Sequence, residues 1–325
     1  MIGVVGAGVV GSRVTDQLVS AGHGVVIFDR DTYRARRLAA LHSRNGDARS
    51  ADALDDLHGL PVVVIAVGTL HAETAERLIE AGSHVVSCSD DMQDVERLLS
   101  LNGRAQELGR TIVVGAATSP GLTGLLVAHL RERFDLIDEA HVAMHGTGGP
   151  DCARQHHRAL SGQSMGWHDG EWLKRPGGSG RELCWFPEPV GSYDCYRSEM
   201  VDPILLHHAM PKLQRVTART SATRRDRFTS RLPMLTPPHA EGGMGAVRVE
   251  VRGFVGQARV VEVAGVAERV GQIAGVVAAV TALHVLSGGF AAGAQVLGAE
   301  GVPNAQIYRA VADAGIRVHR FVGSS

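Results

Sequence analysis

The chain has 325 residues, of which 44% are hydrophobic and 21% are charged, and its formal net charge is −1. This length suffices for about two domains with a sizeable core. A charge so close to zero excludes the strongly basic surface that nucleic acid or an anionic membrane would attract, so we expect neither as a partner.

The number and spacing of the cysteines indicate their oxidation state, the cellular location and whether a metal site is expected. The four cysteines, at positions 88, 152, 184 and 195, form no C-x-x-C pair and have no metal-site spacing. We therefore expect reduced thiols, no metal centre and a cytoplasmic location, since no signal peptide precedes the first strand. The apolar stretch Ile273–Leu286 is too short to span a bilayer and predicts a buried helix.

The first eleven residues carry the strongest local signal. An apolar strand, Met1–Val5, runs into Gly6-x-Gly8-x-x-Gly11 and then into a helix predicted over 12–21. Gly6 permits the tight turn, Gly8 lets a pyrophosphate approach the backbone, and Gly11 lets the helix lie close to the sheet. The free N–H groups at the helix start then face the phosphates, which predicts a dinucleotide site.

The next strand, Gly24–Phe28, ends at Asp29, about 20 residues past the glycines, where a carboxylate meets the ribose hydroxyls of the cofactor. Asp29 favours NAD, whereas Arg30 favours NADP because a guanidinium binds the 2′-phosphate. NAD and NADP both stay open, with a preference for NADP. The residues predicted to bind the cofactor are Gly6, Gly8, Val9, Val10, Gly11, Asp29, Arg30, Ala66, Val67, Gly68 and Ser87.

Strands and helices then alternate, and glycines end the helices. Further strands are predicted at 62–66, 84–87 and 111–114, and helices at 32–43, 72–81, 95–108 and 122–133. This pattern predicts an α/β fold with a doubly wound parallel sheet, whose ligands bind beyond the carboxyl ends of the strands. Loops 66–69, 87–91 and 115–121 are therefore the expected rim, with Ser119 capping the helix that Pro120 opens.

The pattern changes near residue 135. Strands are predicted at 140–145, 216–220, 246–255 and 260–266, a helix at 267–286, and few regular elements between 146 and 195. A helix over 304–314 and a strand over 317–321 follow. We expect a Rossmann domain over 1–134 and a second α+β domain over 135–299, built on a mostly antiparallel mixed sheet for substrate binding and dimerisation. The tail, 300–325, is expected to return to the first domain.

The order of several segments resembles the saccharopine dehydrogenase-like reductases. After the glycine motif, Gly115–Leu126 resembles the family's strand and "PGL" helix, and His145–Gly149 resembles its "GG" loop. Trp167–Glu171 resembles its "dG" hairpin. Cys184–Gly191 resembles its F-P-x-P-x-G segment, and Val247–Gly256 resembles its "rVeVrG" strand. The resemblance implies a homodimer that uses NAD(P)H to reduce a C=N or C=O bond, commonly in an imine of an amino-acid-derived small molecule. Thr118-Ser119 and Ser89-Asp90-Asp91 depart from the family pattern at two substrate loops.

Polar clusters of the second domain supply the candidate active-site residues. The proton-donor candidates are His145, His156, His157 and Tyr196, and the substrate-binding candidates are Asp90, Asp91, Arg154, Tyr193 and Arg197. Histidine is a suitable donor at neutral pH, arginine binds a carboxylate with two hydrogen bonds, and aspartate binds an ammonium group. The acidic pair is also typical of a helix N-terminus.

These residues predict an NAD(P)-dependent oxidoreductase that acts on an imine or carbonyl of an amino-acid-derived or biosynthetic intermediate. Two alternatives stay open. One is a non-catalytic nucleotide-binding or regulatory scaffold on the same fold, and the other is a sugar or aldehyde dehydrogenase, although its E-K-P motif is not found in the sequence.

Overall fold

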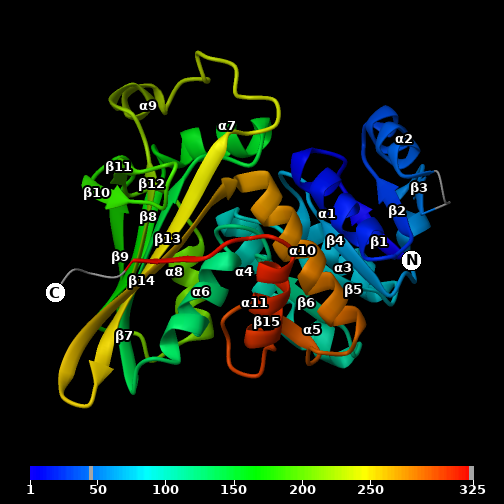
Figure 1. Cartoon of the computed structure of the whole chain (residues 1–325). Helices are drawn as coiled ribbons and strands as arrows, with labels where there is room; N and C mark the ends of the chain where they lie inside the picture. Colours follow the sequence, from blue (N-terminus) through cyan, green and yellow to red (C-terminus); the bar gives the residue numbers. More distant parts are fainter. Residues whose placement is uncertain (44–46, 322–325) are drawn as a thin grey trace.

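The computed structural model describes residues 1–43 and 47–321, which form two β-sheets with helices between and around them (Figure 1). All strands of the first sheet are parallel, in the order β15-β6-β5-β4-β1-β2-β3. Its strands are β1 (Ile2–Val5), β2 (Val25–Phe28), β3 (Ala48–Ser50), β4 (Val62–Ile65), β5 (His84–Ser87), β6 (Thr111–Val114) and β15 (Gly293–Val296).

Both faces of this sheet are covered, which explains its continuous apolar strands. Every residue of β1 and β4 is buried, as expected for parallel strands between two layers of helices. The helices of this part of the chain are α1 (Val9–Ser20), α2 (Thr32–Leu41), the 3₁₀ helix η2 (Leu54–Leu57), α3 (His71–Glu80), α4 (Met92–Ser100), α5 (Asn102–Glu107) and α6 (Leu122–Arg131). The strand order reverses between β1 and β4, where such sheets bind their ligands.

The second sheet is mixed, with one parallel pair, β12–β7, along the path β10-β11-β12-β7-β13-β14-β16, and a β8–β9 hairpin that joins it at β12. Its strands are β7 (Leu136–His145), β8 (Gln163–His168), β9 (Glu171–Pro176), β10 (Glu182–Trp185), β11 (Ser192–Tyr196), β12 (Arg215–Ser221), β13 (Met244–Val255), β14 (Ala258–Arg269) and β16 (His319–Phe321). The remaining helices are α7 (Pro150–Ala159), α8 (Asp202–Ala209), α9 (Arg224–Thr229), α10 (Val270–Leu286) and α11 (Asn304–Asp313). These two sheets confirm the predicted fold class.

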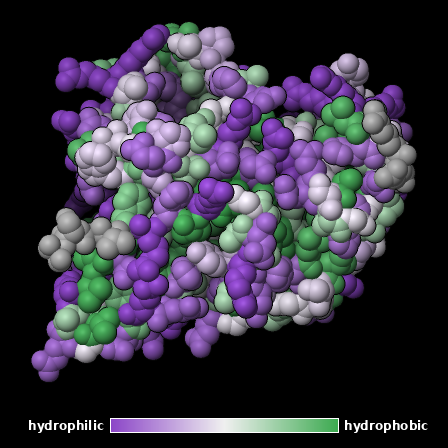
Figure 2. Space-filling view, viewed as in Figure 1, coloured by the Kyte–Doolittle hydropathy of each residue, from purple (hydrophilic) through white to green (hydrophobic). Residues whose placement is uncertain are grey.

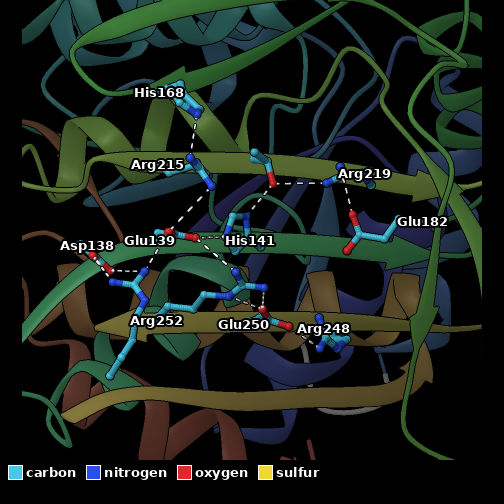
Figure 3. A network of polar contacts seen from close by, with 12 residues as sticks. Asp138, Glu139, His141, His168, Glu182, Arg215, Arg219, Arg248, Glu250 and Arg252 are labelled. Atoms are coloured by element: carbon cyan, nitrogen blue, oxygen red, sulfur yellow. Dashed lines mark hydrogen bonds and ion pairs between the residues drawn. The ribbon is translucent and has the colours of Figure 1, made fainter. Parts of the chain in front are cut away.

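Alternating residues give the second sheet two different faces. Val142, Val216 and Val249 point into the core. The opposite face carries a network of ion pairs that joins β7, β12 and β13 (Figure 3). At its centre, the side chains of Glu139 and Glu250 are only 13% exposed. Glu139 pairs with arginines from β12, β13 and β14, and Glu250 pairs with two arginines of its own strand. The alternation is that of a sheet with one apolar and one polar face.

Helix α10 joins the two halves of the molecule. It lies against α1, β4 and β5 and also contacts β13 and β14 (Figure 1). Nearly all of its side chains are buried, which confirms the predicted buried helix. No helix in residues 1–43 and 47–321 has the length and apolarity that crossing a membrane requires. Figure 2 shows a mostly hydrophilic surface, with hydrophobic atoms near the end of the β13–β14 hairpin, where Val255 and Val261 are exposed.

Several predicted boundaries were wrong. Residues 267–269 end β14 instead of starting a helix, since their pairing with β13 continues to Arg269. The predicted helix over 95–108 is two helices, α4 and α5. The stretch 146–195 is more regular than expected, because α7 and four short strands that pair with one another or with β12 lie within it. Its β8–β9 hairpin confirms the "dG" turn, with positive φ at both Asp169 and Gly170.

The end of the chain is shared between the two sheets. Strand β15, inside the range expected for the second domain, extends the first sheet beside β6. Helix α11 lies against α6 and α10, whereas β16 pairs with β14 of the second sheet. The domain limits at residues 134 and 299 stay predictions, and residues 322–325 of the predicted tail lie outside the described part of the chain.

Candidate functional site

The glycine motif forms a tight turn with an open surface. A Cβ added at Gly6, whose φ is +108°, would overlap the carbonyl oxygen of Ala66, and one at Gly11 would overlap the carbonyl oxygen of Gly6. By contrast, no atom lies within 4 Å of a Cβ built on Gly8, the N-cap of α1. Gly6 and Gly11 thus serve close backbone contacts, while Gly8 leaves room for a ligand at the helix N-terminus.

Asp29 ties this turn to the end of β2. Its Oδ2 accepts a hydrogen bond from the Ala7 N–H at 2.7 Å, and its Oδ1 accepts one from the Asp31 N–H at 2.8 Å. Arg30 is exposed beside it. The sequence therefore identified the position of the carboxylate, but not its contact with the glycine turn; its part in cofactor choice stays a prediction.

A buried histidine that the sequence analysis missed connects two of the predicted cofactor loops. The Nδ1 of His71 lies 2.9 Å from Ser87 Oγ, and its Nε2 lies 2.8 Å from the carbonyl oxygen of Val67. Burial lowers the pKa of this imidazole. Asp94 accepts hydrogen bonds from the N–H groups of His71 and Ala72 at 3.1 Å each and so fixes the start of α3. The rim at 66–68 and 87 is therefore held rigidly.

The second sheet places the start of α7 directly against the cofactor loop. A Cβ added at Gly149 would lie 3.0 Å from the Val9 side chain, and one at Gly68 would lie 3.8 Å from Cβ of Asp151. A Cβ added at Gly271, at the start of α10, would lie 2.7 Å from the Val9 side chain. Glycines at these places let two helices from beyond residue 135 approach the glycine turn, which closes one side of the cleft.

A pocket opens at the carboxyl ends of β5 and β6, where it meets α7 and the segment that leads into α8. Two predicted residues, Asp90 and His156, line it, together with Ser119, Gln155, Ala159, Ser198, Glu199, Met200, Val201, Asp202 and Thr220. No pattern in the sequence points to residues 198–202, because their role depends on how α8 packs. Its volume of about 20 Å³ is close to that of one water, so the pocket marks the floor of a substrate site rather than its full extent. It has the expected location for such a site in a doubly wound sheet.

Asp90, Cys152 and His156 form a compact cluster at this pocket. Their donor atoms all lie within 4.8 Å of one another, and His156 Nε2 is 3.6 Å from Asp90 Oδ2. Burial opposes a charge on His156, yet Cys152 and Asp90 together hold the pKa of its imidazole well above the usual value. The three residues come from segments far apart in the chain, so the spacing of cysteines could not reveal them.

Ser119 does not cap α6 as predicted. The N-cap is Gly121, and Ser119 Oγ instead donates a hydrogen bond to Asp202 Oδ2 at 2.7 Å. Thr123 Oγ1 donates to Asp202 Oδ1 at 2.7 Å. Burial raises the pKa of the Asp202 carboxyl, although the two hydroxyl bonds oppose this. The turn at 118–123 is thus fixed by α8 rather than by its own sequence.

The other candidate acids lie outside the residues that line this pocket. His145, at the end of β7, is hydrogen-bonded to Ser221 Oγ through Nδ1 at 2.8 Å. Its ring is tilted against that of Tyr193, with ring centroids 3.9 Å apart. Burial lowers the pKa of His145. His157 Nε2 bonds the carbonyl oxygen of Thr229 at 3.0 Å, so this imidazole faces the opposite direction from the cleft residue His156.

The remaining candidates have local partners. The ring of the buried Tyr196 lies under the Arg227 guanidinium at 4.1 Å. The exposed Arg154 pairs with Asp151 at 2.7 Å. Arg197 lies beside Gly180 in the turn before β10. Asp91 caps α4 by accepting the Asp94 N–H at 3.0 Å, in agreement with the helix-cap interpretation. None of these four lines the pocket, and their predicted roles stay untested.

A wider hollow lies away from this cleft, between α6 and the segment that leads into α11. Its lining includes Glu132 and Asn304, and the stacked rings of His129 and Tyr308 lie 4.2 Å apart. None of the loops 66–69, 87–91 and 115–121 contributes to it. We therefore place the candidate site at the glycine turn and the Asp90 pocket.

This combination of a glycine turn, a topological switch point and a pocket between two sheets is the fold of the two-domain NAD(P)-dependent dehydrogenases. Residues 1–91 match the family model described as NADP oxidoreductase, coenzyme F420-dependent. This match covers less than a third of the chain and supports a nicotinamide-binding fold in that part.

The comparison with solved structures extends over the whole chain. The chain is similar to the apo saccharopine dehydrogenase (L-Glu forming) from Saccharomyces cerevisiae, with a TM-score of 0.73, 15% identity and coverage of 99% of each chain. DAP dehydrogenase of C. glutamicum in complex with DAP gives a TM-score of 0.52 and 12% identity over 94% of each chain. An engineered D-amino acid dehydrogenase bound to NADP⁺ gives 0.51 and 14%, over 94% of this chain and 95% of that one. The predicted resemblance is confirmed at the level of fold.

Proposed function

We propose that the protein is an NAD(P)H-dependent oxidoreductase that reduces a C=N or C=O bond in a small amino-acid-derived substrate. The observation that carries the proposal is the open surface at Gly8 together with the polar pocket at the ends of β5 and β6. The first fits a pyrophosphate at a helix N-terminus, and the second lies where the nicotinamide end of such a cofactor reaches.

The described residues fit the dinucleotide. The start of α1 would hold the pyrophosphate, the loop at 66–68 and Ser87 would border the nicotinamide half, and residues 29–30 would meet the adenine ribose. The cofactor would supply a hydride. We favour NADP, because both Asp29 oxygens already accept main-chain hydrogen bonds while Arg30 is exposed and available for a 2′-phosphate.

The charge of the pocket favours a substrate with an amino group. Asp90 and Glu199 both line it, and carboxylates there would bind an ammonium group. Burial, followed by the nearby charge of Asp91, raises the pKa of Glu199, as expected for a carboxyl group that is partly buried near another carboxylate. One of the similar structures is named as an engineered D-amino acid dehydrogenase, which supports the same class of substrate.

A titration of the purified protein with NADH and NADPH, followed by nicotinamide fluorescence, tests the proposal first. We expect saturable binding with a preference for NADPH, and then oxidation of the bound cofactor by a panel of keto acids offered with and without amines. Failure of a folded protein to bind either nucleotide would reject the proposal and bring the scaffold alternative forward. The predicted homodimer and the cytoplasmic location stay predictions.

A further inference from the structure

We propose that Asp90, Cys152 and His156 bind a divalent metal of the zinc type at the boundary between the two halves of the molecule. The donor set is a carboxylate oxygen, a thiolate sulfur and an imidazole nitrogen, all within 4.8 Å of one another. In residues 1–43 and 47–321, this is the one group of three such side chains that converges in this way.

The distance between two of the donor atoms matches the edge of a tetrahedral centre, and all three lie within 4.8 Å of one another. Zinc bonds of 2.0–2.3 Å to oxygen, nitrogen and sulfur give ligand-to-ligand edges of about 3.3–3.6 Å. His156 Nε2 and Asp90 Oδ2 are already 3.6 Å apart. The ligand atoms therefore need only a small movement toward a common centre, and the backbone of α7 and of the loop after β5 can stay in place.

The secondary structure explains why these residues converge. Cys152 and His156 are four residues apart on α7, which puts both side chains on one face of the helix. Asp90 lies in the loop after β5, one residue before the cap of α4. The metal would thus join the loop after β5 of the first sheet to α7, the helix that follows β7 of the second sheet.

Neighbouring groups already orient two of the three ligands. Gln155 Nε2 donates a hydrogen bond to Asp90 Oδ1 at 2.8 Å, which leaves Oδ2 facing His156. The Gly148 N–H donates a hydrogen bond to Cys152 Sγ at 3.4 Å, which positions the sulfur atom. Such outer contacts are typical of metal sites.

The chemistry of the donors selects the metal. A thiolate with an imidazole suits zinc better than magnesium or calcium, which prefer oxygen ligands. One carboxylate and one thiolate also neutralise the charge of a dication, so the loaded site carries no net charge. All three side chains are partly buried, and their contact with water is already reduced.

Three protein ligands leave a fourth position open, as in catalytic rather than structural zinc sites. Asp90 and His156 both line the substrate pocket, so this position faces the substrate. This step rests on the proposed function: a carbonyl oxygen or imine nitrogen would bind there by its lone pair. The reduced cofactor would supply a hydride: its C–H bond would break as the new C–H bond of the product forms, which leaves the nicotinamide oxidised. The π electrons of the C=O or C=N bond would pass to the oxygen or nitrogen, whose charge a metal would stabilise, and water would supply the proton. His156 would then act as a ligand instead of a proton donor. Asp90 would also be a ligand, so that Glu199 would remain to bind an ammonium group of the substrate.

Zinc binding can be measured without any turnover. The full chain is stripped with a chelator and titrated with Zn²⁺ against an indicator dye, and separately with Co²⁺ to follow its absorption. We expect one Zn²⁺ per chain, and a near-ultraviolet sulfur-to-cobalt band with tetrahedral visible bands. Cys152→Ser, Asp90→Asn and His156→Ala should each weaken zinc by about 100-fold or more, since even outer-sphere changes cost 10–100-fold. Cys152→Ser should also remove the sulfur band.

Cys88→Ser is the matched control. Cys88 is also a partly buried free thiol near this rim, but its Sγ contacts the Ala116 carbonyl oxygen at 3.6 Å and lies outside the cluster. This variant should bind Zn²⁺ as the wild type does. Thermal melting of each metal-free variant establishes that it is folded before its affinity is compared.

Absence of stoichiometric Zn²⁺ binding, or an equal loss in Cys88→Ser, would overturn the site. Metal binding with an unchanged rate of substrate reduction in the stripped protein would overturn its catalytic part. Nicotinamide binding by the stripped protein is measured in parallel. If it persists while zinc does not bind, the metal proposal fails alone; if it is absent, the proposed function fails instead.

Discussion

The substitution Gly8→Ala separates cofactor binding from folding. Gly8 has φ −80° and ψ −165°, which alanine adopts without strain, and its added Cβ would meet no atom within 4 Å. Alanine also restricts the unfolded chain, so we expect stability to rise by roughly 0.4–1 kcal/mol. The new methyl group would stand where the pyrophosphate must approach, and we expect NADPH to bind at least ~10-fold more weakly, a loss of about 1.4 kcal/mol.

Two further glycines make this test specific. Gly103→Ala, in α5, also adds a Cβ with no atom within 4 Å and should be at least as stable as the wild type, with unchanged NADPH affinity. Gly11→Ala would overlap the Gly6 carbonyl oxygen and should lose about 1–3 kcal/mol of stability. Urea unfolding and fluorescence titration measure both quantities. An unchanged NADPH affinity in folded Gly8→Ala protein would refute the placement of the pyrophosphate.

Three other changes test the contacts around the site. Asp29→Ala should shift the ratio of dissociation constants in favour of NADPH over NADH. It should also lower the free energy of unfolding by about 1 kcal/mol, because the hydrogen bond to the glycine turn is lost. An unchanged ratio would show that the carboxylate does not discriminate between the two cofactors. Asp202→Ala should lower the free energy of unfolding by about 2–3 kcal/mol, because two buried hydroxyls lose their partner. Asp202→Asn keeps both polar positions and should lower it much less. Equal losses of the two variants in urea unfolding would contradict this. Glu139→Gln should destabilise by about 1–3 kcal/mol, since three arginines lose a partly buried counter-charge. Despite burial, His141, Arg215 and Arg252 hold the pKa of Glu139 below its usual 4.5, so its contribution is present above that value and lost as pH falls through the lower folded pKa. Melting temperatures at pH 7 and pH 3 should therefore differ less in Glu139→Gln than in the wild type, and an equal difference would argue against this source of stability.

Local signals account for the parts of the site that the sequence predicted. The glycine turn depends on contacts between residues close in the chain, such as Gly6 with Gly11, and on an apolar strand whose neighbours bury it on both faces. The loops at 66–69 and 87–91 follow from the same alternation of strand and helix. These features are set by main-chain geometry, which the spacing of glycines and apolar residues reveals directly.

The failures share a different cause, since each depends on a partner distant in the sequence. Ser119 looks like a helix cap beside Pro120, but Asp202 takes its hydroxyl. Cys152 looks like an isolated thiol until α7 is placed opposite Asp90. Histidines 156 and 157 are adjacent in sequence, yet one lines the pocket and the other faces α9. Which side of α7 meets the cleft is decided by packing, and no local pattern contains that information.

Helix α7 is therefore the element on which the site depends most. It begins directly after β7, the central strand of the second sheet, through a turn in which Gly146 and Gly149 have positive φ. That turn lets the helix lie against the Val9 side chain of the cofactor loop while its inner face meets Asp90. Any motion of the second sheet relative to the first would move His156 relative to Asp90 and open the pocket between them. A ligand held by both residues would resist this motion, so binding at the cluster and closure of the cleft should be thermodynamically coupled.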